Sequence, residues 1–405
     1  MKSIKENIVN YLPILIIFIF SIVILGKIYD RNVGGWAIGE VLINYEGGFV
    51  RRGLLGQIAF IYQDPIFLVT ALQKVIVSLF LISLIYLVAV EKSVRLKWLL
   101  TLSIVFVSGG LYDFSQANSF EYLDRKEVWF YFSLFLIIIL SRTWGFYDTK
   151  TMGAISLIST IMILHHEVYV LYVLPIIFLL IMVNKDKLYK NLLIAIFPPV
   201  ITFILVFINH GDPNISTAIH NSYLNTHGLD IRGGVSSIGW TFYDSFALSL
   251  RAAIEGSIAY WIFFFLLSFS MITMLILSKF NKITDLALVF LLNIFLILAT
   301  AISVVSGWDW GRWVSMYAFF SIYSIYLYEI AVSDVKESWS ISLLNSDTVV
   351  SKDLKYQIMF TIFITLLLYL AVNTRMNHCC PQNNAIELTV VDNIKNKVFE
   401  RLKND

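Results

Sequence analysis

Residues 153–183 read GAISLISTIMILHHEVYVLYVLPIIFLLIMV, an apolar run of 31 residues with His165, His166 and Glu167 near its middle. As one helix this run would be about 46 Å long, although the hydrocarbon core of a bilayer is only ~30 Å thick. Two shorter helices that meet at the His-His-Glu sequence are the alternative. The choice between one span and two decides on which side of the membrane every later segment lies.

The placement of lysine and arginine favours two helices. Short cytoplasmic loops collect these residues, so the loops with Lys92 and Lys97 and with Arg142 and Lys150 are expected inside. A single span over 153–183 would place the following lysines outside, whereas a hairpin keeps them inside and leaves the His-His-Glu turn outside. The lysines that the hairpin places in the cytoplasm are Lys185, Lys187, Lys190, Lys279, Lys282, Lys336, Lys352 and Lys355.

The composition of the whole chain agrees with a membrane protein. Of its 405 residues 58% are hydrophobic and 14% are charged, whereas soluble domains carry about 25% charged residues. This composition excludes a soluble enzyme, a nucleic-acid-binding protein and a disordered chain. The net charge of +2 is too small to attract polyanions by bulk field, and the adjacent Cys379 and Cys380 provide no disulfide framework.

The predicted fold is therefore all-α: a polytopic integral membrane protein with about eleven transmembrane helices and a cytoplasmic N-terminus. Residues 1–373 are expected to form a single transmembrane helical domain, and residues 374–405 an extracytoplasmic C-terminal tail. The spans are predicted at residues 11–25, 72–90, 98–111, 128–140, 153–164, 168–183, 191–208, 257–277, 286–304, 313–332 and 357–373.

Most of the unusual polar residues fall outside the membrane in this topology. Three outer segments carry clustered cations, against the tendency of basic residues to stay inside. Such exceptions point to function. The outer segments are residues 27–71, 112–127, the His-His-Glu turn, 209–256, 306–312 and the tail, and the exceptional cations are Arg51, Arg52, Arg125, Lys126 and Arg312.

The sharpest local motif is residues 44–56, NYEGGFVRRGLLG. Its glycines permit positive φ and close backbone approach, and Arg51 and Arg52 offer forked donors for a phosphate or carboxylate. The alternative is an interfacial helix whose arginines reach lipid headgroups. Two adjacent arginines cannot share one helical face, which favours a shaped loop that binds substrate diphosphate.

Two carboxylates of this first outer segment are candidate catalytic bases. Asp30 follows the first span directly, where it could act on a substrate whose lipid tail stays in the bilayer. Glu46 precedes the arginine pair and is either a base or an ion-pair partner. The alternative for Asp30 is a solvated helix end.

The second outer segment, residues 112–127, ends in a dense group of charges: Glu121, Asp124, Arg125, Lys126 and Glu127. The three acids are spaced by three and could share a helix face. Arg125 and Lys126 are candidates for diphosphate binding, and a divalent cation is a further option. Acids favoured by the helix macrodipole at the start of a helix are the structural alternative.

The turn His165-His166-Glu167 lacks the spacing of a helical zinc site, and adjacent histidines point to different sides. Titratable groups at membrane depth are costly and tend to be functional. His166 and Glu167 are therefore candidates for catalysis or proton handling, beside a structural polar contact.

Residues 307–313, GWDWGRW, lie between two predicted spans. Trp308, Asp309 and Trp310 are candidates for sugar binding, and Arg312 for diphosphate binding. An interfacial aromatic belt explains the tryptophans equally well.

The residues on the outer face suit a lipid-delivered substrate, because nucleotide sugars are cytoplasmic. The EGGFVRRGLLG, Asp-Arg-Lys-Glu, His-Glu and Asp-Trp-Gly-Arg sequences resemble those of Wzy-type O-antigen or capsule polymerases and, more loosely, GT-C-type glycosyltransferases. The resemblance implies a bacterial inner-membrane, multi-pass enzyme with a periplasmic active face. It would build O-antigen or capsular polysaccharide from polyprenyl-diphosphate-linked oligosaccharide repeat units.

The resemblance also implies which partners the protein has. These are the lipid bilayer, the lipid-linked donor, and chain-length regulators or flippases, with no nucleic acid. No cofactor is expected, and the lack of an Asp-x-Asp motif leaves a divalent metal open. The rival functions are a transporter or flippase of lipid-linked oligosaccharide and an acyltransferase centred on His166 and Glu167.

Overall fold

The computed structural model describes residues 2–29, 35–91, 126–252, 283–306 and 310–337, with scattered positions in 97–101 and 262–276. Helices make up nearly all of these residues, and none of them is in a strand. The spans predicted at 98–111 and 357–373, most of the one at 257–277, and the tail with Cys379 and Cys380 lie outside this part of the chain.

Within the described residues, four helical segments are long and apolar enough to cross a membrane. They are α4 (Pro65–Val90), α6 (Glu127–Trp144), the segment Lys185–Ile208, and most of α16 (Ile283–Ser306). Shorter apolar stretches lie in α1 (Lys2–Tyr29) and over Tyr169–Val183. The protein is thus an α-helical chain with several helices fit to span a bilayer, and the count of eleven stays a prediction.

The stretch that decides the topology folds as a hairpin. Helix α7 (Thr149–His165) ends where the backbone of His166 becomes extended, and α8 (Tyr169–Tyr172) and α9 (Leu174–Val183) follow. The Tyr147 hydroxyl, just before α7, donates to the Leu180 carbonyl near the end of α9 at 2.8 Å. The two arms therefore run antiparallel, which confirms the prediction of two helices with the His-His-Glu sequence at their turn.

Other boundaries differ from the predicted ones. Helix α4 begins seven residues before position 72, because Asp64 caps it by accepting from the Phe67 N–H at 3.0 Å and Pro65 stands in its first turn. The span predicted at 191–208 is divided between α10 (Leu188–Ala195) and α11 (Phe197–Ile208), with prolines in the first turn of α11, and η3 (Lys185–Lys187) precedes α10.

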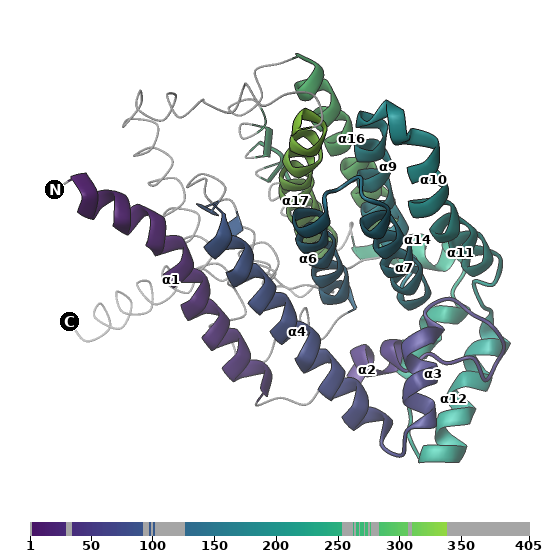
Figure 1. The fold of residues 1–405 in the computed structure, drawn as a ribbon. Helices are drawn as coiled ribbons and strands as arrows, with labels where there is room; N and C mark the ends of the chain where they lie inside the picture. The colour runs from purple at the N-terminus through teal and green to yellow at the C-terminus, as the bar shows by residue number, and fades with distance from the viewer. Residues whose placement is uncertain are drawn as a thin grey trace, which may run out of the picture.

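The bundle is held by a large apolar core in which aromatic rings join α4, α6 and α17 (Trp310–Glu337). Phe80 of α4 stacks on Phe135 of α6 at 5.1 Å between ring centroids, and Phe319 and Tyr323 of α17 pack beside them. Figure 1 shows α6, α7, α9, α16 and α17 gathered in this bundle and α1 running along α4.

Many large apolar side chains are exposed on the outer faces of the helices. Soluble proteins rarely expose large contiguous apolar patches, so these side chains fit lipid contact. On α11 alone, seven large apolar side chains are exposed: Phe197, Val200, Ile201, Ile204, Leu205, Phe207 and Ile208.

Two segments expected as loops fold together over one end of the bundle. We call this unit the cap, defined as residues 35–64 and 209–241. It contains α2 (Gly35–Val41), α3 (Gly53–Ile61), α12 (Pro213–His227), α13 (Arg232–Val235) and η4 (Ser236–Gly239), and α14 (Phe242–Ala252) follows it. The cap has its own apolar core, separate from that of the bundle, with Leu42, Ile43, Ile219 and Tyr223 at its centre. Figure 1 shows α2, α3 and α12 side by side below α7 and α11.

The opposite end of the bundle carries an ion pair of its own. Arg142, near the end of α6, lies 3.3 Å from the carboxylate of Glu91, which follows α4. The Tyr326 hydroxyl of α17 donates to the same carboxylate at 2.7 Å and also contacts Arg142. About 16 residues of helix, roughly 24 Å, separate this pair from the capped end.

Candidate functional site

The candidate site lies where the cap meets the turn between α7 and α8. The arginine pair reaches it because the chain turns sharply before α3: Gly48 has a φ of 112° and Arg52 a φ of 67°. A positive φ at a residue other than glycine is uncommon, and such strain gathers at functional sites. The Arg51 N–H donates to the Asn209 carbonyl at 3.2 Å and fixes the loop to the end of α11. This left-handed turn lets two adjacent side chains converge, as the sequence predicted for a shaped loop.

Arg52 is held by two carboxylates. Its Nε lies 2.9 and 3.1 Å from the two oxygens of Glu167, and its Nη2 lies 2.6 Å from one of them. Its Nη1 donates to Glu40 of α2 at 3.0 Å. Both sides of the guanidinium are therefore occupied, and charge-assisted bonds of this kind are roughly twice as strong as neutral ones.

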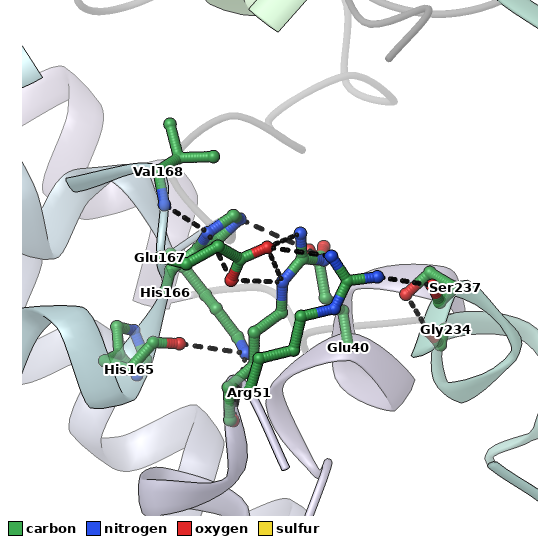
Figure 2. A network of polar contacts seen from close by, with 10 residues as sticks. Glu40, Arg51, His165, His166, Glu167, Val168, Gly234 and Ser237 are labelled. Atoms are coloured by element: carbon green, nitrogen blue, oxygen red, sulfur yellow. Dashed lines mark hydrogen bonds and ion pairs between the residues drawn. The ribbon is translucent and has the colours of Figure 1, made fainter. Parts of the chain in front are cut away.

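Arg51 is held more loosely and joins three parts of the protein. Its Nη1 donates to Glu167 at 3.2 Å and its Nη2 to the carbonyl of Ser237 in the cap at 3.0 Å (Figure 2). Among the described residues, the buried Nε of Arg51 meets no hydrogen-bond acceptor. Its side chain is 21% exposed, compared with 14% for Arg52. Arg51 thus has one donor that no described protein group satisfies, whereas the donors of Arg52 bond to Glu167 and Glu40.

The two histidines of the turn face different surroundings, as expected for neighbours. The His165 ring packs on Trp129, and the His166 ring packs edge-on against Phe130. His166 is 1% exposed, accepts from the Val168 N–H at 3.3 Å, and lies 3.3 Å from a Glu167 oxygen through its Nδ1. Its Nε2 is 3.7 Å from Glu40.

The ionisation of the cluster follows from its burial and its charges. Burial lowers the pKa of the His166 imidazole, and Arg52 lowers this pKa further, while Glu167 opposes both. Burial alone would raise the pKa of Glu167, but Arg52, His166 and Arg51 outweigh it and hold that pKa well below its usual value. At neutral pH the turn therefore presents a neutral imidazole and an ionised carboxylate.

Lys126 lies beneath the backbone of the arginine loop, away from solvent. Its side chain is almost fully buried, and its Nζ points to the carbonyls of Arg52 and His165 at 3.5 and 3.4 Å. Burial lowers the pKa of Lys126 to about 7. The predicted contact of Lys126 with a diphosphate does not fit this geometry, because the ammonium faces the backbone of the loop.

We expect Lys126 to make stability depend on pH. Between pH 7 and the usual pKa of 10.5, the unfolded chain binds a proton that the folded protein excludes. The free energy of unfolding should therefore rise by up to about 1.4 kcal/mol per pH unit across this window and stay flat below it. Comparing SDS titrations of the wild type and Lys126→Met from pH 6 to 9 isolates this contribution, and parallel curves would contradict it.

The remaining predicted residues are not all brought to the cluster. Glu46 is exposed, and its side chain accepts from Gln57 at 3.4 Å. The arginines pair with Glu167 and Glu40 instead. The prediction of Glu46 as their ion-pair partner is therefore wrong. Glu127 is buried at the start of α6. Asp30, Arg125, Trp308, Asp309 and the side chains of Trp310 and Arg312 lie outside the described residues.

Glu40 is the member of the cluster that sequence reasoning missed. It is 5% exposed and contacts both Arg52 and His166. The sequence around Glu40 could have indicated it, because residues 36–43 read WAIGEVLI, an apolar stretch with a single charge. A lone charge in such a stretch needs a partner, since burying an unpaired charge is very costly.

Taken together, the cluster is electrically balanced and holds protein groups suited to anion binding and proton transfer. Two arginines face two carboxylates, with a neutral imidazole beside them. Over the described residues no group of three or more His, Cys, Asp or Glu side chains could hold a metal ion. No protein-family model, curated protein or solved structure matches this chain.

Proposed function

We propose that this protein is a glycosyltransferase of the bacterial inner membrane that polymerises polyprenyl-diphosphate-linked repeat units into O-antigen or capsular polysaccharide. One observation carries the proposal: Arg51 and Arg52 converge with Glu167 and a neutral His166 at one end of a bundle with apolar outer faces. Such a site binds an anionic headgroup at the membrane surface while a lipid tail stays in the bilayer. The capped end is taken as periplasmic.

In this mechanism Arg51 holds the diphosphate and Glu167 is the base, with His166 beside it. The acceptor hydroxyl oxygen attacks the anomeric carbon of the donor sugar and gives its proton to Glu167. The bond from that carbon to the diphosphate oxygen breaks, and its electron pair leaves on the diphosphate. The arginine charge stabilises the departing diphosphate, which is the largest kind of contribution in such reactions.

The neutral state of His166 supports this assignment. A neutral imidazole next to the base can take up the proton from Glu167, so that Glu167 is ready for the next cycle. An imidazole held charged could not do so. Glu46 and Asp30 stay candidate bases by their place in the first outer segment.

Replacing Arg51 by glutamine tests the function. The change removes the charge but keeps a polar side chain of moderate size, so we expect normal protein abundance with a loss of long-chain polysaccharide of more than about 100-fold. Loss of a charge that stabilises the leaving group typically lowers the rate by that order. The measurement is the chain-length ladder of surface polysaccharide in a deletion strain that carries each variant.

Arg142→Gln is the matched control, because Arg142 also pairs with a glutamate but lies at the opposite end of the bundle. Its ladder should be normal. A normal ladder from Arg51→Gln at wild-type abundance would overturn the proposed function.

A flippase of lipid-linked oligosaccharide is the second candidate, and the ion pairs at both ends of the bundle favour it. Pairs such as Arg51–Glu167 and Arg142–Glu91 could close the two ends in turn. For a flippase, both arginine variants should fail, and single repeat units should be trapped in the cytoplasmic leaflet. For a polymerase, only Arg51→Gln fails, and single units accumulate on the outer surface.

A further inference from the structure

The two carboxylates of the cluster differ in how firmly they are placed. Glu40 is on a helix inside the cap, and its side chain is 7% exposed. Glu167 is in the non-helical turn between α7 and α8, and its side chain is 17% exposed. A turn residue near the surface can change its side-chain position at less cost than a residue built into a packed helix.

Glu167 also accepts from the guanidinium N–H groups that an anionic ligand would need. Its carboxylate accepts one bond from Arg51 and three from Arg52, between 2.6 and 3.2 Å. With Glu40 included, two cations face two anions, so this arrangement does not attract a diphosphate by net charge. A diphosphate that binds here must first replace a carboxylate.

The surroundings favour Glu167 as the carboxylate that leaves. Arg51 has a buried Nε without an acceptor among the described residues, so a phosphate oxygen that takes the place of Glu167 gains an unsatisfied donor. The Glu167 carboxylate also has no bond to the helix of Glu40: over the part of the chain that the structure describes, its partners are the two arginines and the neighbouring His166, whose Nδ1 lies 3.3 Å from one of its oxygens. Glu40 meanwhile continues to hold Arg52.

We infer that Glu167 is an exchangeable counter-ion, which closes the arginine site when it is empty and is displaced by the diphosphate of a lipid-linked substrate, while Glu40 is the permanent counter-ion. This inference rests on the proposed function and adds regulation to the same site. Displacement takes Glu167 away from two cations, which restores its basicity. Glu167 can therefore accept the proton of the acceptor hydroxyl only when the lipid-linked sugar donor is bound.

Binding of inorganic pyrophosphate to the purified full-length protein in lipid nanodiscs tests the exchange. Glu167→Gln keeps the shape of the side chain but weakens its hold on the arginines, so the open form is more populated and apparent affinity rises. We expect about tenfold tighter binding than in the wild type, which corresponds to loss of one charge-assisted bond. Glu40→Gln should bind no more tightly than the wild type, and Arg51→Gln should bind at least about tenfold more weakly.

Each outcome bears on one of the two proposals. If Glu167→Gln binds pyrophosphate as the wild type does, or more weakly, while Arg51→Gln loses binding, the exchange is wrong and the arginine site stands. If Arg51→Gln binds as tightly as the wild type, the arginine site fails and the exchange fails with it. Glu167→Asp is the second variant should glutamine prevent folding: its shorter side chain should also tighten binding, by a smaller factor, and unchanged or weaker binding counts against the exchange.

Farnesyl diphosphate distinguishes a lipid substrate from free diphosphate. If the natural ligand carries a polyprenyl tail, farnesyl diphosphate should bind more tightly than pyrophosphate, and Glu167→Gln should tighten both by the same factor. Equal affinity for the two probes would assign the site to a soluble diphosphate and overturn the lipid part of the inference.

Discussion

Replacing Arg52 by alanine should lower the free energy of unfolding by about 3 to 5 kcal/mol. The Glu167 and Glu40 side chains are 17% and 7% exposed, and Arg52 is the residue that bonds to both. Removing one partner of a buried ion pair leaves an uncompensated charge, and losses of this order are typical. The measurement is an SDS titration of the purified protein at fixed detergent, followed by near-UV circular dichroism.

Two further variants separate the causes of this loss. Arg142→Ala removes an arginine that is 32% exposed and pairs with one carboxylate, so its effect should be about 1 kcal/mol or less. Arg52→Gly also removes the charge but suits the φ of 67°, so it should be more stable than Arg52→Ala by about 1 kcal/mol. Equal stability of Arg52→Ala and the wild type would show that the cluster does not hold the cap on the bundle.

Arg51 and Arg52, adjacent in sequence, should therefore respond differently to substitution. Arg52 has both sides of its guanidinium occupied and is chiefly structural, whereas Arg51 keeps a donor and is more exposed. We expect polysaccharide synthesis to be lost in Arg51→Gln without a large change in stability. In Arg52→Ala both should be lost.

The sequence predicted the parts of this structure that depend on local chemistry. The hairpin over 149–183 follows from the length of the apolar run and the position of the lysines, and it is present. The shaped loop at the arginine pair follows from its glycines. The association of this loop with the His-His-Glu turn was predicted only as a common side of the membrane, because contacts across more than 100 residues leave no local pattern.

The cap could not be predicted for the same reason. Residues 35–64 and 209–241 were expected as parts of two outer loops, and they share one apolar core although about 150 residues separate them in the sequence. Their helices are short, and their apolar side chains become buried only against each other. Glu40 was missed because its partners come from two distant segments. The acids that reach the arginine pair are therefore determined by contacts between segments that are distant in the sequence.

The second large effect is expected at a glycine of the cap rather than at a charged residue. Replacing Gly56 by alanine should lower the free energy of unfolding by about 3 kcal/mol or more and should abolish polysaccharide synthesis. A Cβ at this position would lie 1.8 Å from the Ile43 carbonyl oxygen and 2.6 Å from the Leu42 carbonyl carbon. Both neighbours are backbone, which cannot rotate away, so the cost falls at or above the usual range for overpacking.

The site should be affected because Gly56 lies in α3, which begins directly after Arg52. The Gly56 carbonyl also accepts from the Tyr223 hydroxyl at 2.8 Å, which joins α3 to α12. If α3 moves away from residues 42 and 43, the arginine turn moves with it, and the bonds from Arg52 to Glu40 and Glu167 cannot both be kept. Activity is thus lost because the arginine turn is displaced. Pyrophosphate binding should therefore fall together with the free energy of unfolding.

Gly153→Ala is the matched control. Gly153 lies within α7, and a Cβ there meets nothing within 4 Å. Alanine in a helix interior is favoured over glycine by about 0.5 to 1 kcal/mol, so this variant should be as stable as the wild type or slightly more so, with normal polysaccharide. If Gly56→Ala unfolded at the same SDS concentration as Gly153→Ala, the close contact of α3 with residues 42 and 43 would be wrong. The cap would then have to hold the arginine turn through its side chains alone.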